Sequence, residues 1–145
     1  MCCWWGHLAK VLKAKGFNVK TSDIINRGYE NTEIIDFLKY NINFDGDIIT
    51  NPPYKFCSEF ILKSLEVIPQ GNKIAMFLKL QTLEGQKRYE TIFSKYPPKV
   101  IYVCVKRIQC GKNGEFTGSS AVCYAWFVWQ KGYYQYPVIK WINYD

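Results

Sequence analysis

The sequence predicts an α/β fold with a mostly parallel sheet and one antiparallel strand near the C-terminus. Apolar runs of strand length alternate with segments of helical periodicity along most of the chain. The last two apolar runs are separated by a glycine-rich loop without a helical segment, which favours an antiparallel pair. A chain of 145 residues has room for one core, so we expect a single domain over residues 1–145.

Helical periodicity is found in three segments. Leu8, Val11 and Leu12 mark the apolar face of the first, and Gly16 stands where a C-terminal cap belongs. Pro69 follows the second segment and ends it. We expect helices over about 7–15, 57–68 and 84–95.

Five apolar runs have the length and composition of strands. They are bounded by prolines, glycines or polar residues, and Pro52 and Pro53 follow the second run. We expect strands over 17–23, 46–50, 73–78, 100–105 and 121–129.

The composition narrows the class of protein. A net charge of +7 favours a polyanionic partner. No apolar run reaches the roughly 20 residues of a membrane helix, and the first residues lack the pattern of a signal peptide, so we expect a cytoplasmic protein without membrane contact. The six cysteines contain no C-x-x-C pair and His7 is the only histidine, so we expect buried thiols and no metal site.

The strongest chemical signal is Asn51-Pro52-Pro53-Tyr54, directly after a buried strand. An aryl amine is a poor nucleophile, so a catalyst should accept hydrogen bonds from both of its N–H groups. The Asn51 amide and the Pro52 carbonyl can do so, because the two prolines hold that carbonyl in a stiff extended loop. The Tyr54 ring offers a face on which a flipped base can stack. The alternative is an ordinary proline turn.

With these residues the sequence resembles the amino-methyltransferases, and especially the small solitary adenine-N6 DNA methyltransferases of phages and prophages. The likeness runs from about Gly6 to Asn143. It implies a Rossmann-like methyltransferase sheet, S-adenosylmethionine as cofactor and DNA as partner. It also implies that the catalytic residues are Asn51, Pro52, Pro53 and Tyr54.

The resemblance also implies a cofactor site. Asp23 matches the acid that binds the ribose hydroxyls, while Asp36 and Phe37 match the pair that contacts the cofactor adenine. Gly6 belongs to the segment that approaches the methionine part. The alternatives are a plain surface acid at Asp23 and a packed helix in which Asp36 lies at the margin.

A loop before the last predicted strand resembles the substrate loop of the family. Phe116 is expected to close the other side of the flipped base, and Lys106, Arg107 and Lys112 are expected to hold phosphates. Alternatively, Phe116 is an apolar anchor for a long loop, and the three basic residues form a solvated rim.

The N-terminus departs from the family pattern. Trp4 stands where the resemblance places the first glycine, and an indole gives neither the backbone freedom nor the close approach of glycine. Only five residues precede Gly6, so we expect a short or missing first strand, an N-terminally truncated family member and weakened cofactor binding.

The sequence is also compatible with other functions. The same tetrapeptide occurs in methyltransferases that act on protein glutamine, on RNA guanine and on the N4 amine of DNA cytosine. A catalytically inactive remnant that binds nucleic acid or a protein partner is the alternative from a different class.

Overall fold

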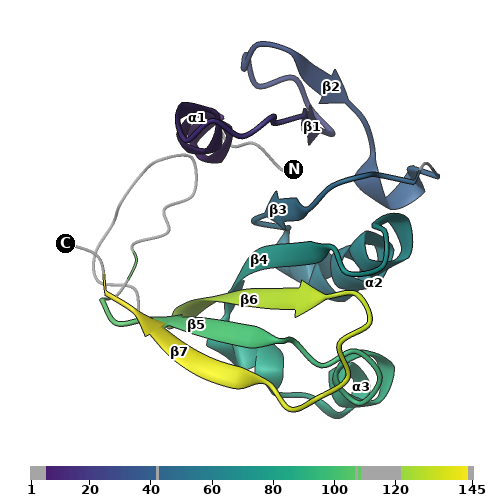
Figure 1. Cartoon of the computed structure of the whole chain (residues 1–145), viewed down its shortest axis with the longest axis vertical. Coiled ribbons are helices and arrows are strands. Elements are labelled where there is room, and N and C mark those ends of the chain that lie inside the picture. Colours follow the sequence, from purple (N-terminus) through teal and green to yellow (C-terminus); the bar gives the residue numbers. More distant parts are fainter. Residues whose placement is uncertain (1–5, 42, 107, 109–121, 144–145) are drawn as a thin grey trace.

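The computed structural model describes residues 6–41, 43–106, 108 and 122–143 (Figure 1). Among the described elements, helical segments separate the strands from β2 to β5, whereas β1 and β2 follow one another directly and β6 and β7 follow β5 without a helix. The main elements are α1 (His7–Ala14), β1 (Thr21–Asp23), β2 (Thr32–Ile34), β3 (Ile48–Thr50), α2 (Cys57–Val67), β4 (Lys73–Lys79), α3 (Gln86–Arg88), β5 (Val100–Cys104), β6 (Tyr124–Gln130) and β7 (Val138–Ile142). The predicted α/β class is confirmed.

The larger sheet has five strands in the order β3-β4-β6-β5-β7. β6 is antiparallel to both of its neighbours, while β3 with β4 and β5 with β7 are parallel pairs. The predicted single reversed strand near the C-terminus is therefore β6. Its ladder with β4 runs over seven residue pairs, from Lys73 opposite Gln130 to Lys79 opposite Tyr124.

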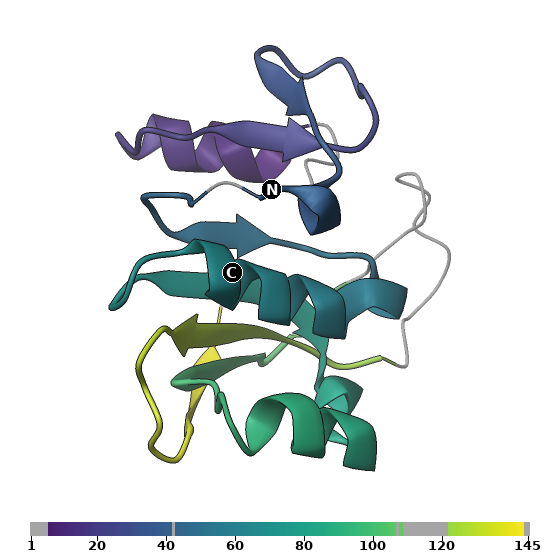
Figure 2. The ribbon, with the colours of Figure 1, turned by 90° about the vertical axis from the view of Figure 1, so that its right-hand side faces the viewer.

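A second, two-stranded sheet consists of β1 and β2 in parallel register. Figure 2 shows this pair beside β3, on the side away from β4. Among the described residues no strand precedes α1, and Trp4 and the short first strand expected there lie outside the described residues.

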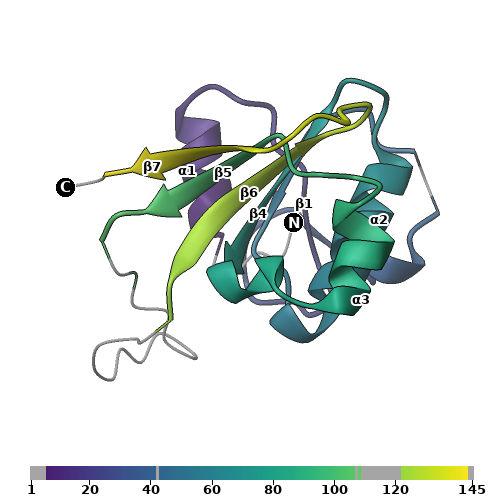
Figure 3. The same cartoon turned by 90° about the horizontal axis from the view of Figure 1, so that it is seen from below.

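The core lies on one face of the larger sheet, under α2 and the helical segment at 86–93 (Figure 3). Residues of one parity along β4 and β6 point into it because side chains alternate between the two faces of a strand. Those that are fully buried are Ile74, Met76, Leu78, Ala125, Phe127 and Trp129. The buried Trp129 indole N–H donates to the Tyr96 carbonyl at 2.9 Å, which avoids the cost of an unpaired polar group.

The first helix ends as its sequence predicts. The Phe17 N–H donates to the Leu12 carbonyl at 3.2 Å, and the Gly16 N–H donates to the Lys13 carbonyl at 2.9 Å. These are the two hydrogen bonds of a Schellman cap, and Gly16 supplies the required positive φ of 85°. None of the described helices is long and apolar enough to span a membrane.

The structure corrects several boundaries. The predicted strand over 17–23 is reduced to β1, and the helix predicted over 84–95 is a single α-helical turn that continues as a π-helix over Tyr89–Phe93. The last strand pair is not terminal, because β7 follows and pairs with β5. β7 escaped prediction because its residues Val138, Ile139 and Trp141 are apolar yet exposed, so the strand lacks the alternation of a half-buried one.

We expect Phe127→Ala to lower the free energy of unfolding by about 3–5 kcal/mol, because it removes a fully buried ring from the middle of β6. Urea denaturation followed by circular dichroism measures this change. Phe17→Ala is the matched control, since the Phe17 ring is 63% exposed and its loss should cost less than about 1 kcal/mol. Equal losses for both variants would contradict the assigned position of the core.

Candidate active site

The loop that follows β3 combines an exposed asparagine with a buried proline. Asn51 is exposed and Pro52 is buried. The Pro53 carbonyl accepts from the Phe56 N–H at 2.9 Å, which closes a short 3-10 turn over Tyr54–Phe56. Among the described residues, by contrast, no donor reaches the Asn51 side chain or the Pro52 carbonyl. Neither oxygen is therefore engaged by a donor from the described part of the chain.

The Tyr54 ring joins this loop to the larger sheet. Its centroid lies 6.1 Å from that of Tyr124 at the start of β6, and Tyr124 in turn stacks on Phe77 at 5.2 Å. Phe77 also meets Trp126 at 5.3 Å. These four rings form an aromatic column on the sheet face opposite the core, and it holds Tyr54 at the carboxyl ends of β3 and β4.

A lysine completes this end of the sheet. The Lys79 ammonium lies 4.9 Å from the centroid of the Tyr54 ring, within the range of a cation–π contact. Lys79 is the last residue of β4 and is half-buried. Sequence analysis missed both Lys79 and Tyr124, because their proximity to Tyr54 depends on the strand order and register, not on a local motif.

Asp23 is a buried acid at the end of β1 and is 5% exposed. Its Oδ2 lies 3.3 Å from Nε of Arg27, and its Oδ1 accepts from the Ile25 N–H at 3.2 Å. The alternative of a plain surface acid is therefore wrong, while the role of Asp23 toward a ribose stays a prediction. Each oxygen thus already accepts from one protein donor, and a ligand hydroxyl would compete with Arg27 for this acid.

Asp36 and Phe37 lie next to Asp23, because the Ile35 N–H donates to the Asp23 carbonyl at 2.9 Å. The Asp36 carboxylate caps the 3-10 turn Phe37–Lys39 by accepting from the Leu38 N–H at 3.2 Å. The Phe37 ring stacks on Phe60 of α2 at 5.3 Å. The structure thus places Asp36 beside Asp23, with both carboxylates engaged by protein donors.

Gly6 is buried directly before α1, with a φ of 66°. A Cβ at this position would overlap the Tyr29 ring, so the site requires glycine for conformation and for space. Tyr29 is held by two cation–π contacts, with the ammonium groups of Lys10 and Lys13 at 5.8 and 5.3 Å from its centroid. Tyr29 therefore covers the segment where the methionine part of the cofactor is expected.

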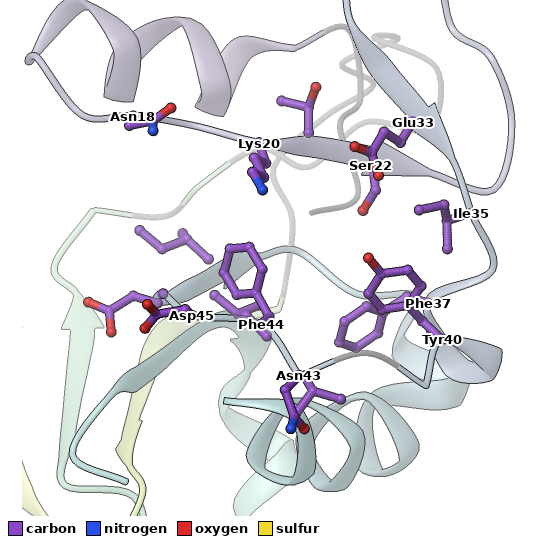
Figure 4. A pocket seen from close by; sticks show the side chains of 16 residues that line it. Asn18, Lys20, Ser22, Glu33, Ile35, Phe37, Tyr40, Asn43, Phe44 and Asp45 are labelled. Atoms are coloured by element: carbon purple, nitrogen blue, oxygen red, sulfur yellow. The ribbon is translucent and has the colours of Figure 1, made fainter. Parts of the chain in front are cut away.

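A cavity of about 440 Å³ lies between the segment leading into β1 and the segment leading into β3 (Figure 4). Figure 4 shows Ser22, Glu33 and Ile35 on one side and the rings of Phe37, Tyr40 and Phe44 on the other. Of the predicted cofactor residues only Phe37 lines this cavity, and the described lining residues do not include the loop at 51–54.

Of the four predicted substrate-binding residues, the structure describes one. Phe116, Arg107 and Lys112 lie outside the described residues, so their roles stay predictions. Lys106 is described and exposed, two residues after the end of β5. Within the described ranges no three His, Cys, Asp or Glu side chains are grouped as metal ligands would be.

Comparison with known proteins finds solved structures of partial similarity. No family model and no curated protein matches the sequence. A predicted O-methyltransferase from Agrobacterium tumefaciens is 17% identical over 66% of this chain and 40% of that chain, with a TM-score of 0.46. The M1.HpyAVI–SAM complex is 15% identical over 68% of this chain and 56% of that chain, with a TM-score of 0.40. The chain thus spans about half the length of these two neighbours.

We expect Asp23→Ala to destabilise the fold by about 1–3 kcal/mol, because it leaves the Ile25 N–H and the Arg27 guanidinium without their buried acceptor. Thermal unfolding measures the loss. Asp45→Ala, at an exposed position, is the matched control and should be nearly silent. An unchanged melting temperature for Asp23→Ala would show that this carboxylate does not support the local structure.

Proposed function

We propose that the chain is a methyltransferase domain that transfers a methyl group from S-adenosylmethionine to the N6 amine of adenine in DNA. The observation that carries this proposal is the loop at Asn51–Tyr54. It places two unengaged oxygen acceptors and an aromatic ring together at the carboxyl end of β3.

The acceptors explain why an amine is the proposed target. The Asn51 amide oxygen and the Pro52 carbonyl each accept one N–H of the aryl amine, which draws electron density back toward nitrogen. Positive charge grows on that nitrogen as the new N–C bond forms, so two fixed acceptors stabilise the transition state more than the ground state. The prolines fix the loop before substrate arrives.

The aromatic column explains why a planar base is the proposed carrier of that amine. The Tyr54 ring is 36% exposed, while Tyr124 behind it is 6% exposed. The Tyr54 ring is therefore supported by Tyr124 on its inner side and exposes part of its surface to solvent. Stacking of a flipped base on such a ring contributes about 1–3 kcal/mol. The net charge of +7 supports a nucleic acid as the carrier of that base.

The cofactor residues fit S-adenosylmethionine only in part. Gly6, Asp23, Asp36 and Phe37 would hold it, and when bound it supplies an activated methyl group. Arg27 now occupies the Asp23 carboxylate and the Tyr29 ring covers Gly6. Cofactor binding has to break both contacts, so the free energy of breaking them reduces the affinity of the chain for S-adenosylmethionine.

The same two contacts favour a second candidate function. A chain in which Arg27 and Tyr29 keep the cofactor segment closed is a non-catalytic domain that binds nucleic acid through its basic surface. The two functions differ in one measurable property, which is the binding of S-adenosylmethionine.

We expect S-adenosylmethionine to bind with a dissociation constant above about 1 μM, and Tyr29→Ala to tighten binding about five- to thirtyfold. The gain follows from the two cation–π contacts that the loop no longer has to break, each about 0.5–1 kcal/mol. Isothermal titration calorimetry measures both values. Tyr136→Ala is the control, because that ring is 93% exposed. Submicromolar binding by the unmodified chain would refute the closed state, and no binding by either protein would favour the non-catalytic function.

We expect methylated adenine as the product when the Tyr29→Ala chain is incubated with DNA and labelled S-adenosylmethionine, with Asn51→Ala in that background abolishing turnover while leaving cofactor affinity unchanged. Asn51 contacts only the target amine, so its loss appears in kcat. Mass spectrometry of digested DNA, RNA and protein identifies the product.

Asn41→Ala is the matched control for this experiment. Asn41 is exposed, and its side chain accepts from the Lys63 ammonium on α2, away from the loop at 51–54. Label on cytosine, RNA or glutamine and never on adenine would overturn the adenine assignment. An Asn51→Ala variant with half the parent rate would remove Asn51 from its assigned role.

A further inference from the structure

Lys79 has an unusual position for a lysine. Side chains on β4 alternate, so Lys79 shares a face with Phe77, and its register partner across the sheet is Tyr124. Its ammonium lies 4.9 Å from the Tyr54 ring centroid. The charge is thus placed at the aromatic column, directly beside the surface proposed to receive a base.

This charge has no acidic partner among the described residues. The ion pairs found there use Arg27, Lys39 and Lys63, and the contact made by Lys79 is the one with the Tyr54 ring. A ring face attracts a cation by about 0.5–2 kcal/mol but accepts none of its three N–H donors as a carboxylate or phosphate would. A half-buried ammonium in this state is suited to an anion that arrives with the substrate.

We propose that Lys79 is a substrate-binding residue that holds a phosphate of the nucleotide whose base stacks on Tyr54. This inference rests on the proposed function and adds a contact to the phosphate backbone of its nucleic acid substrate. The incoming base takes the ring face that the ammonium now covers. The flexible four-carbon stem lets the ammonium swing from the ring to a backbone phosphate next to that base.

The movement of the Lys79 ammonium from the Tyr54 ring to a phosphate also distinguishes between classes of amine substrate. A nucleotide within a strand brings its own anion, which replaces the cation–π contact that the base breaks. A free nucleobase or a glutamine side chain brings none, so either ligand would displace the ammonium without compensation. Lys79 thereby favours phosphate-bearing substrates over protein glutamine at the same acceptor pair.

A purely structural role for Lys79 predicts a different outcome. In that case the ammonium only fixes the Tyr54 ring, and its removal would weaken binding by the same factor at every salt concentration. A phosphate contact releases counterions, so its removal changes the salt dependence itself.

The test is binding of a fluorescently labelled, adenine-containing single-stranded DNA oligonucleotide to the full chain, measured by anisotropy over a series of salt concentrations. We expect Lys79→Met to weaken binding and to reduce the slope of log K against log salt by about 0.7, the value for one phosphate contact on a single strand. Lys79→Arg should keep the slope, because it keeps the charge.

Lys73→Met is the matched control. Lys73 is an exposed lysine on the same strand and face, six residues earlier and therefore about 20 Å away. It should leave the slope unchanged. Lys79→Gln serves as the second charge-removing variant should Lys79→Met not fold by circular dichroism.

Two results would overturn the inference and are distinguishable. An unchanged slope for Lys79→Met and Lys79→Gln, with the oligonucleotide bound by the parent chain, rejects the phosphate contact and leaves the proposed function standing. An oligonucleotide that the parent chain does not bind at any salt concentration rejects the nucleic acid substrate and the role of Lys79 together.

Discussion

The antiparallel ladder between β4 and β6 is the constraint on which the rest of the molecule depends. Because β6 lies between β4 and β5, a single strand fixes the register of both neighbours. Its alternation sends Phe127 and Trp129 into the core and Tyr124 and Trp126 to the opposite face. A shift of one residue would exchange the two sets, so core burial and the aromatic column are specified by the same pairing.

Much of the fold is readable from the sequence because its signals are local. The period of α1, the glycine at its end and the apolar run of β4 each identify an element without knowledge of its neighbours. β7 is not readable in this way, because Val138, Ile139 and Trp141 are exposed and their strand forms only by pairing with β5. The π-helical turn at Tyr89–Phe93, which buries Ile92, likewise has no local signal that distinguishes it from an α-helix.

The candidate site likewise contains residues that a local motif predicts and residues that only the tertiary structure brings together. The loop at Asn51–Tyr54 is a contiguous motif after a recognisable strand, so its residues could be named in advance. Lys79 and Tyr124 reach it from two other strands, and only the register brings them there. Contacts of Asp23 with Arg27 and of Gly6 with Tyr29 come from a turn whose course the sequence did not indicate. These contacts decide whether the named residues are accessible.

The division into two sheets also affects which part of the protein opens first by local unfolding. The β1–β2 ladder has three residue pairs, whereas β4 and β6 share seven. Short ladders with few buried side chains open at a lower free energy than the core strands, so amide hydrogens of β1 and β2 should exchange before those of β4 and β6. We therefore expect the side of the molecule that carries Asp23 to open locally while the loop at Asn51 remains folded. Any ligand that joins the two sides would slow that exchange, which makes protection of the small sheet an intrinsic reporter of occupancy.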